Sequence, residues 1–389
     1  MKFASKMESL SESILIDFEK RRIQKTDSGA EIINLSVGTP DLPPPAHVVE
    51  ALVAACRDPE NMKYPLTDLP ALKESAIGWY QRRYGVELDT KNITSLCGSQ
   101  DGLSHIALVM CDPGDRVMVP DPGYPIFLNT AGIASAENIL LPVREEDGFL
   151  PRLEDISPAD AHAAKVMIIS YPANPVGAMA TDDFYERVIH FAKKHGIMVL
   201  HDNAYSEITF DGRVGGSFLQ YKGAMDVGVE FNSLSKSYNM TGMRISFAVG
   251  NRDVVKHLAS LKSHTDYGVF RPVQYAAAAA LNGPQDIVEN MRALYQRRRD
   301  LLISEFGKAG WKIRPPEGTM FVFAKIPEGY KGSMEFAIEL LEKTGVLCVP
   351  GIGFGPGGEG YVRLALVQDD ENIIKAADKI KASGLLAGQ

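Results

Sequence analysis

Between about residues 90 and 250, short runs rich in apolar and β-branched residues alternate with longer stretches of helical pattern. Strands that alternate with helices at this spacing predict βαβ units, in which helices cover both faces of a mainly parallel sheet. We therefore expect an α/β fold for this part of the chain. The runs expected to form strands centre on Ile93, Val117–Val119, Val166–Ser170, Ile197–Leu200, Val227–Phe231 and Ile245–Val249.

The pattern changes near residue 286. An amphipathic helix around Met291, short strands around Phe321, Leu347 and Val362, and a helix that opens at Asp370 indicate a smaller α+β domain. The first residues are too few for a domain of their own. We expect an N-terminal helix and arm over 1–36 that packs on the small domain or on a partner subunit, a large α/β domain over 37–285, and a small C-terminal domain over 286–389.

The composition is that of a globular protein and argues against several classes. Of the 389 residues 45% are hydrophobic and 23% are charged, near the globular average. The net charge of −8 argues against a general affinity for nucleic acid or anionic membranes. No apolar run approaches the ~20 residues of a membrane helix, and the mostly alanine run Tyr275–Leu281 predicts a buried helix. With no export signal expected in 1–25, we predict a cytoplasmic protein.

The cysteines, histidines and charge runs suggest no special chemistry. Cys56, Cys97, Cys111 and Cys348 form no CxxC pair, so we expect buried thiols in a reducing compartment rather than a zinc site or a disulfide framework. The eight histidines show no pair at ligand spacing on one helix, and no metal is expected. The run Arg297–Arg299 lies on a predicted helix, and we interpret it as a solvated face.

The segment Asn232–Arg244, which follows a predicted strand, places one lysine among hydroxyl groups. Ser233, Ser235 and Arg244 suit a bound phosphate, and the Lys236 amine could then form a Schiff base with an aldehyde of the same ligand. A phosphate-bearing aldehyde cofactor is pyridoxal phosphate. The alternative interpretation is a serine-rich loop with an exposed lysine.

Other loops also follow predicted strands, and ligands of open α/β sheets bind outside the carboxyl ends of the strands. The loop Gly98–Gly102 opens a helical stretch, so its amides and the helix dipole can receive a phosphate. The loop Asp121–Pro125 presents Tyr124, whose flat face could stack on a pyridine ring. Each signal has an ordinary alternative, because glycine pairs are commonly turns and tyrosines commonly pack in loops.

Two polar residues at predicted strand ends suit the rest of such a ring. Asn174, in the turn Pro172–Gly177, could donate to a ring hydroxyl, although turn chemistry explains it equally well. The Asp202 carboxylate could pair with a protonated pyridine nitrogen, although aspartate in this place is also commonly a helix cap. His201 could support that carboxylate or could be a packed strand residue.

Together these segments resemble the fold-type I pyridoxal-phosphate-dependent aminotransferases of class I and II. The resemblance runs from Val37-Gly-Thr-Pro-Asp41 to Val362-Arg-Leu-Ala-Leu366, and its ordered segments around a Ser-x-Ser-Lys core are highly specific. It implies a large domain with a mainly parallel sheet of the seven-stranded type, a smaller α+β domain, pyridoxal phosphate as cofactor, and a homodimer with shared active sites. Within the family the chain looks most like the branch of LL-diaminopimelate, aspartate and alanine aminotransferases.

The resemblance also implies roles for individual residues. Lys236 would be the Schiff-base anchor and general base, with Asp202 and Tyr205 as further catalytic residues on the ring nitrogen and the phenolic oxygen. Arg363 would clamp the substrate α-carboxylate, together with Gly38 and Asn174. The residues expected to bind the cofactor are Gly98, Ser99, Gln100, Tyr124, Asn174, Asp202, Tyr205, Ser233, Ser235, Lys236, Arg244 and, from the neighbouring subunit, Tyr64.

Some positions depart from the family pattern. Gln100 stands where diaminopimelate enzymes often have lysine, so the phosphate contact there would be neutral. The sequence of the segment His264–Arg271 differs from that of most relatives, which leaves open the specificity for the side chain of the substrate. Arg271 and Lys262 are the candidates for contact with a distal carboxylate of the substrate.

The expected reaction is a ping-pong transfer of an amino group from an L-amino acid to a 2-oxo acid. The donor could be LL-diaminopimelate, aspartate, alanine or glutamate. One alternative is a lyase on the same fold, acting by β-elimination or decarboxylation, because these enzymes share the cofactor motifs. The other is a cofactor-binding regulator, but such a protein needs a DNA-binding module, and the 36 residues before Val37 show no basic patch and no helix-turn-helix length.

Overall fold

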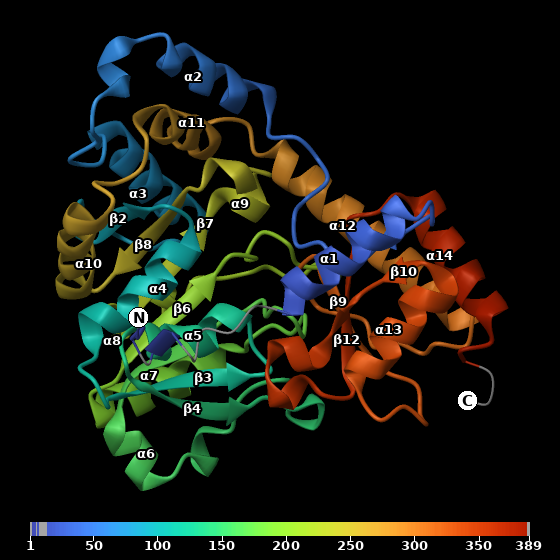
Figure 1. Cartoon of the computed structure of the whole chain (residues 1–389). Coiled ribbons are helices and arrows are strands. Elements are labelled where there is room, and N and C mark those ends of the chain that lie inside the picture. Colours follow the sequence, from blue (N-terminus) through green and yellow to red (C-terminus); the bar gives the residue numbers. More distant parts are fainter. Residues whose placement is uncertain (1, 5, 8–13, 387–389) are drawn as a thin grey trace.

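The computed structural model describes residues 2–4, 6–7 and 14–386. A seven-stranded sheet of order β2-β8-β7-β6-β5-β3-β4 forms its centre (Figure 1). Strand β8 runs antiparallel to β2 and β7, and the other neighbouring pairs are parallel, which confirms the predicted mainly parallel sheet. The strands are β2 (Ile93–Leu96), β3 (Arg116–Asp121), β4 (Glu137–Pro142), β5 (Ala164–Ile169), β6 (Met198–Asn203), β7 (Gly228–Ser233) and β8 (Ser246–Gly250).

Helices cover both faces of this sheet. Helices α4 (Ser99–Met110), α5 (Pro125–Ile133) and α10 (Arg252–Thr265) pack on one face, and α3 (Pro70–Tyr84), α7 (Asp182–His195) and α11 (Arg271–Asn282) pack on the other. The inner strands are almost entirely buried because helices cover both of their faces, and β5 shows this as the apolar run Val166–Ile169. The alanine-rich run lies in α11 with most of its side chains buried, as predicted. Further helices of this part are α2 (Ala46–Cys56), α6 (Pro158–Ala163), α8 (Ala224–Val227) and α9 (Leu234–Ser237).

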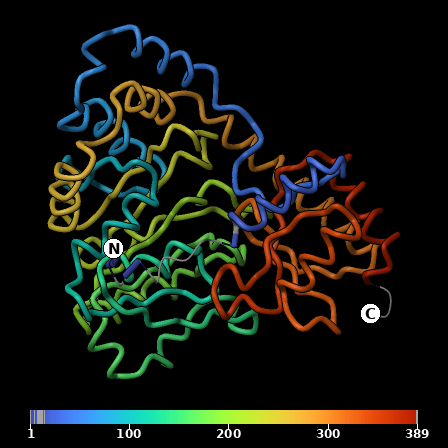
Figure 2. Tube along the Cα trace, viewed as in Figure 1, coloured from blue at the N-terminus to red at the C-terminus, as the bar shows by residue number. Residues whose placement is uncertain are grey.

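The C-terminal part is built on a three-stranded antiparallel sheet of order β11-β12-β9. The N-terminal elements α1 (Ile14–Asp27) and β1 (Ile33–Asn34) pack here, because β1 pairs with β10 and the buried Phe18 ring joins the same core as Trp311. Figure 2 shows this N-terminal helix, in blue, beside the red C-terminal helices. The domain boundaries stay a prediction. The other elements are α12 (Asp286–Lys308), β9 (Phe321–Lys325), α13 (Ser333–Thr344), β10 (Val346–Leu347), β11 (Val349–Pro350), β12 (Tyr361–Ala365) and α14 (Asp370–Ser383).

The prediction that Arg297–Arg299 forms a solvated face is wrong for two of its three residues. Arg298 and Arg299 are only 5% and 4% exposed. Arg298 donates two hydrogen bonds of 2.8 Å to the Asp41 carboxylate, and Arg299 donates two of 2.7 Å to Asp211. A guanidinium can be buried when a carboxylate meets it with both oxygens. Because both partners are distant in sequence, the run alone could not reveal them.

The thiol prediction also needs correction. All four cysteines are free, but only Cys348 is buried. Cys97 and Cys111 are half-buried, and Cys56, at the end of α2, is exposed. Among the described residues, no helix is long and apolar enough to cross a membrane.

Candidate active site

A cavity of about 580 Å³ opens at the carboxyl ends of β5, β6 and β7. These strands are parallel neighbours, so the residues that follow them meet at one edge of the sheet. The arm before α2, the start of α4 and strand β12 complete the walls. The predicted site residues that line this cavity are Gly38, Ser99, Gln100, Tyr124, Asn174, Asp202, Tyr205, Ser233, Ser235, Lys236, Arg244 and Arg363.

The Lys236 amine lies in the cavity and donates a hydrogen bond to the Gly38 carbonyl oxygen. Burial lowers the pKa of this amine to about 8, and the positive charges of Arg363 and Arg244 act in the same direction. A sizeable fraction of the amine is therefore unprotonated near neutral pH. It can act as a nucleophile toward an aldehyde and as a base, which an ordinary solvated lysine does poorly.

Asp202, at the end of β6, is 6% exposed, and its Oδ1 has no hydrogen-bond partner among the described residues. Burial raises the pKa of this carboxyl to about 7, while the charge of His201 acts in the opposite direction. A buried carboxylate oxygen without a partner is costly unless a ligand completes it. A protonated ring nitrogen fits this position.

The far end of the cavity fits a phosphate. Gly98 has a φ of +83° and allows the chain to turn into α4, whose N-terminal amides face a ligand there. A Cβ atom at Gly98 would collide with the Arg244 guanidinium, so glycine lets this cation approach the turn. The Ser99 hydroxyl is buried without a partner in the described chain. A helix N-terminus, a free hydroxyl and a guanidinium are the groups that hold phosphate in proteins.

Arg363 on β12 is 3% exposed and lines the same cavity. Its Nη1 donates to Asn174 Oδ1 at 3.1 Å, its Nη2 donates to the Ser36 carbonyl at 2.9 Å, and its buried Nε has no partner within the described residues. The guanidinium lies 4.0 Å from the centre of the Phe321 ring. Burial lowers the pKa of Arg363 to about 10, so it stays charged at neutral pH and can receive a carboxylate.

Sequence reasoning missed several side chains of the cavity. Glu19 on α1 and Phe321 on β9 line it, although neither belongs to a recognisable motif. They arrive there only because α1 and β9 pack against the strand ends from distant parts of the chain. The other lining residues that were not predicted are Phe18, Ser36, Val37, Thr39, Leu103, Ala204, Thr241, Gly242 and Val349.

Tyr64 does not reach the cavity of its own chain. Its side chain is 74% exposed, and its ring packs 5.3 Å from the ring of Tyr267. Gly98 does not line the cavity itself. Its lack of a side chain leaves room for the Arg244 guanidinium, which does line the cavity. The expected contact between Tyr64 and a neighbouring subunit's phosphate stays a prediction.

The two candidates for a distal carboxylate contact also lie outside the lining. Arg271 donates to the Glu60 carbonyl at 3.3 Å, and the Lys262 ammonium lies 2.6 Å from Asp266 and 2.5 Å from Asp101. Cys97 lies beside these two carboxylates, close enough for the group to hold an ion. The lysine charge already satisfies both carboxylates.

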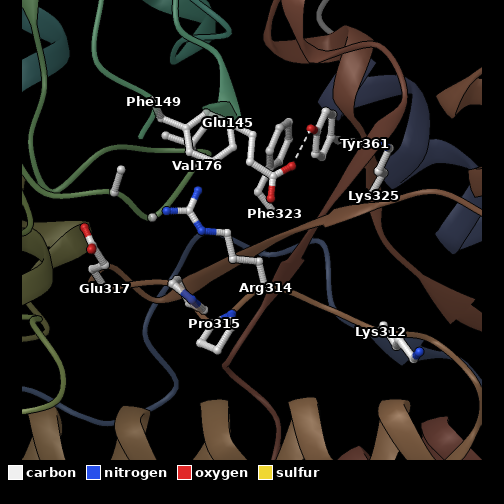
Figure 3. Close-up of a pocket in the computed structure, with 13 residues that line it drawn as sticks. Glu145, Phe149, Val176, Lys312, Arg314, Pro315, Glu317, Phe323, Lys325 and Tyr361 are labelled. Atoms are coloured by element: carbon white, nitrogen blue, oxygen red, sulfur yellow. Dashed lines mark hydrogen bonds between the residues drawn. The ribbon is translucent and has the colours of Figure 1, made fainter. Parts of the chain in front are cut away.

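A second cavity, of about 140 Å³, is lined by Val176, Gly177 and Ala178, which follow β5, and by residues of the C-terminal part such as Arg314 and Tyr361 (Figure 3). In Figure 3 the Glu145 carboxylate points toward the Tyr361 hydroxyl, which donates to it at 2.9 Å. The Arg314 guanidinium lies 5.2 Å from the centre of the Phe149 ring. None of the predicted site residues lines this cavity, so it is separate from the candidate cofactor site.

Comparison with known proteins agrees with this geometry. The model of the family described as "Aminotransferase class I and II" matches residues 30–380. The chain is 44% identical to the LL-diaminopimelate aminotransferase of Moorella thermoacetica over 98% of each chain, and 40% identical to that of Halothermothrix orenii over 99% of each.

Solved structures give the same result. Substrate-bound BacF from Bacillus subtilis is similar with a TM-score of 0.95 and 36% identity over 98% of each chain. The probable N-succinyldiaminopimelate aminotransferase from Thermus thermophilus is similar with a TM-score of 0.89 and 35% identity over 95% of this chain and 100% of that one. The chain therefore belongs to the class I and II aminotransferases, which use pyridoxal phosphate to move an amino group from an amino acid to a 2-oxo acid.

Proposed function

We propose that this protein transfers an amino group from LL-diaminopimelate to a 2-oxo acid, either 2-oxoglutarate or pyruvate. The observation that carries the reaction type is the convergence of unpartnered buried atoms of Ser99, Asp202 and Arg363 around the cavity that holds Lys236. The relatives named for LL-diaminopimelate at 40% to 44% identity support the donor. Aspartate, alanine and glutamate are the competing donors.

The proposed site holds the cofactor at both ends. When bound, pyridoxal phosphate supplies an aldehyde to the amine and a ring that takes up the electron pair released at the substrate Cα. Asp202 would hold the ring nitrogen in its protonated form. Tyr124 would cover the ring face, Asn174 and Tyr205 would hold the phenolic oxygen, and Ser99, Gln100, Ser233, Ser235 and Arg244 would hold the phosphate.

Lys236 and Arg363 would act on the substrate. Arg363 binds the α-carboxylate through its free Nε and orients the Cα–H bond, with Asn174 and Gly38 beside it. Lys236 has a pKa of about 8, which leaves some of its amine unprotonated near neutral pH. This amine would take the proton from the substrate Cα, hold it on Nζ and then release it. A lyase would need the same base, but the relatives are named as transaminases and do not favour that alternative.

We propose that Glu19 recognises the far end of the donor. LL-diaminopimelate carries both a second ammonium and a second carboxylate there, whereas aspartate and glutamate carry only a second carboxylate and alanine carries neither. Glu19 and Asp202 are the two acidic residues among those that line the cavity. Glu19 also accepts hydrogen bonds of 2.9 Å and 2.7 Å from Arg22, which keep its carboxylate charged and able to meet the distal ammonium.

The donor is tested by Glu19→Gln with Asp17→Asn, a charged neighbour on the same helix that pairs with Arg21, as its control. We expect Glu19→Gln to raise KM for LL-diaminopimelate about tenfold and to leave KM for glutamate unchanged, because one charge-assisted hydrogen bond is lost. Asp17→Asn should change neither value. Equal changes in KM for all donors would refute the role of Glu19, and no turnover of LL-diaminopimelate by the wild-type protein would rule out this donor.

We also propose a cytoplasmic homodimer with two domains divided as predicted. Met62, Tyr64, Leu66, Tyr267 and Phe270 are each more than 40% exposed, and the contact between the Tyr64 and Tyr267 rings brings the two segments together. Exposed apolar side chains gathered in this way are typical of an interface. Four free thiols agree with a reducing compartment.

A further inference from the structure

Strand β6 presents two ionisable side chains to opposite faces of the central sheet. Asp202 faces the cofactor cavity, and its neighbour His201 faces the core on the other side. His201 is in register with Glu230 on the parallel strand β7, and both side chains are 0% exposed. The structure therefore decides between the two interpretations of His201, because its ring meets Glu230 and does not bond the Asp202 carboxylate.

Both ring nitrogens of His201 face hydrogen-bond acceptors. Nδ1 lies 2.8 Å from Glu230 Oε2, and Nε2 lies 3.1 Å from the Tyr171 carbonyl oxygen. A carbonyl oxygen can only accept, so Nε2 must carry a hydrogen to bond it. The Tyr185 hydroxyl is farther from Nε2, at 3.4 Å.

Glu230 is held in its ionised form by donors on both oxygens. Tyr80 donates to Oε1 at 2.7 Å, and the Ser217 hydroxyl and the Phe218 amide donate to Oε2 at 2.9 Å each. An ionised Glu230 can only accept from Nδ1, so both nitrogens of His201 carry hydrogens.

We propose that His201 is an imidazolium and a positioning residue, whose charge behind β6 keeps the neighbouring Asp202 carboxylate ionised for the ring nitrogen of the cofactor. This inference rests on the proposed role of Asp202. Burial raises the pKa of Asp202 to about 7, and the charge of His201 opposes that rise. Without this charge, Asp202 would take up a proton at higher pH and lose its hold on a protonated nitrogen.

The surroundings of the two groups support this division of roles. On the far side of the sheet, the ionisable groups described around His201 are Glu230 on β7, Tyr185 on α7, Tyr80 and Tyr84 on α3, and Tyr171 and Tyr221 on loops. The ionisable groups that share the cavity with Asp202 are Glu19, Tyr124, Tyr205, Lys236, Arg244 and Arg363.

The first test measures the protonation of His201 directly. We would record long-range ¹H–¹⁵N spectra of the wild-type holoenzyme, labelled with ¹⁵N-histidine, at neutral pH, and assign His201 as the signal that is absent in His201→Gln. Tyr185→Phe, which changes a neighbour of the ring, gives the same assignment if His201→Gln does not fold. The proposal expects two protonated ring nitrogens. One unprotonated nitrogen would overturn it, whatever the role of Asp202.

The second test uses Glu230→Gln, which keeps the shape of the acceptor but removes the charge that holds the imidazolium. The dissociation constant of pyridoxal phosphate is measured across pH by absorbance titration. We expect the acid-side midpoint, below which affinity is lost, to move up by on the order of one pH unit, because a neutral His201 no longer lowers the pKa of Asp202. Ser217→Ala removes a donor to Glu230 without changing its charge and should leave the midpoint in place. Equal midpoints in the two variants would contradict the proposal.

A third variant separates this inference from the proposed function. If Asp202→Asn binds pyridoxal phosphate with wild-type affinity and pH dependence, then Asp202 does not hold the ring nitrogen and the proposed site is wrong. The ¹⁵N spectra of the wild-type protein still decide the protonation of His201 in that case. If Asp202→Asn binds weakly while His201 is neutral, the proposed site stands and the role given to His201 fails.

Discussion

At the scale of single residues, the active site keeps three ionisable side chains in a buried environment that disfavours their charges. Burial lowers the pKa of Lys236 to about 8 and of Arg363 to about 10, and raises the pKa of Asp202 to about 7. Ligand atoms would complete the partners that Asp202 and Arg363 lack in the described chain. These buried charges, which the function needs, therefore lower the free energy of unfolding of the cofactor-free protein.

Asp202→Asn should stabilise the cofactor-free protein at pH 8. The folded chain holds the Asp202 proton up to a pKa of about 7 against an ordinary value of 3.8, so ionised Asp202 lowers the free energy of unfolding as pH rises through this window. The gain should reach up to about 4 kcal/mol at pH 8 and should nearly vanish at pH 4. Urea unfolding of both proteins across pH measures it, and a variant that is less stable at pH 8 would show that Asp202 is not strained.

Arg363→Lys should lower kcat/KM for the amino donor about 30-fold. Lysine keeps the charge but lacks the planar fork that bonds Asn174 and the Ser36 carbonyl while Nε faces the substrate carboxylate, and a charge-assisted hydrogen bond contributes about 2 kcal/mol. Arg314→Lys in the second cavity is the matched control and should have no effect. Steady-state kinetics measure kcat/KM for both variants. Equal effects of the two substitutions would refute the role of Arg363 in binding the substrate α-carboxylate.

The sequence predicted those site residues that follow strands. Asn174, Asp202 and Lys236 come after parallel strands, whose ends must meet at one sheet edge. Glu19 and the pairing of Arg298 with Asp41 could not be predicted, because both depend on how distant elements pack. Local pattern carries no information about such contacts.

At the scale of elements, the strands that sequence pattern predicts best are those buried on both faces. All residues of β7 and all but Lys165 of β5 are buried, and both strands were predicted. Strand β4 was missed, because it lies at the sheet edge and only Leu141 of its six residues is buried. An edge strand needs little apolar pattern, so its sequence does not distinguish it from a loop.

The turn before α4 makes a specific prediction for Gly98→Ala. Alanine would be strained at the φ of +83° and would also displace the Arg244 guanidinium, so affinity for pyridoxal phosphate should fall at least tenfold. Gly114→Ala is the matched control. Gly114 also has a positive φ, of +90°, but no atom of the described residues would lie within 4 Å of a Cβ there. Both variants should lose about 1–2 kcal/mol of stability. Equal cofactor affinities in the two variants would refute the phosphate cradle.

At the scale of the whole molecule, the apolar surface around Tyr64 predicts a homodimer. We expect the substitution Leu66→Asp to dissociate this dimer into monomers. Leu66 is 67% exposed beside Tyr64, and an aspartate there would bury an unpaired charge in the proposed interface. Val214→Asp changes a residue that is 71% exposed elsewhere and should leave the dimer intact. Light scattering after size exclusion gives the masses, and a wild-type monomer would contradict the shared active site.

The proposed function depends most directly on an amino-group transfer that requires Lys236. We would incubate the protein, with pyridoxal phosphate and 2-oxoglutarate, with ¹⁵N-labelled LL-diaminopimelate, and follow the label by mass spectrometry. We expect ¹⁵N-glutamate from the wild-type protein, at a rate that rises with pH toward about 8 as Lys236 loses its proton, and none from Lys236→Ala. Labelled ammonia without glutamate, or transfer that survives in Lys236→Ala, would contradict it.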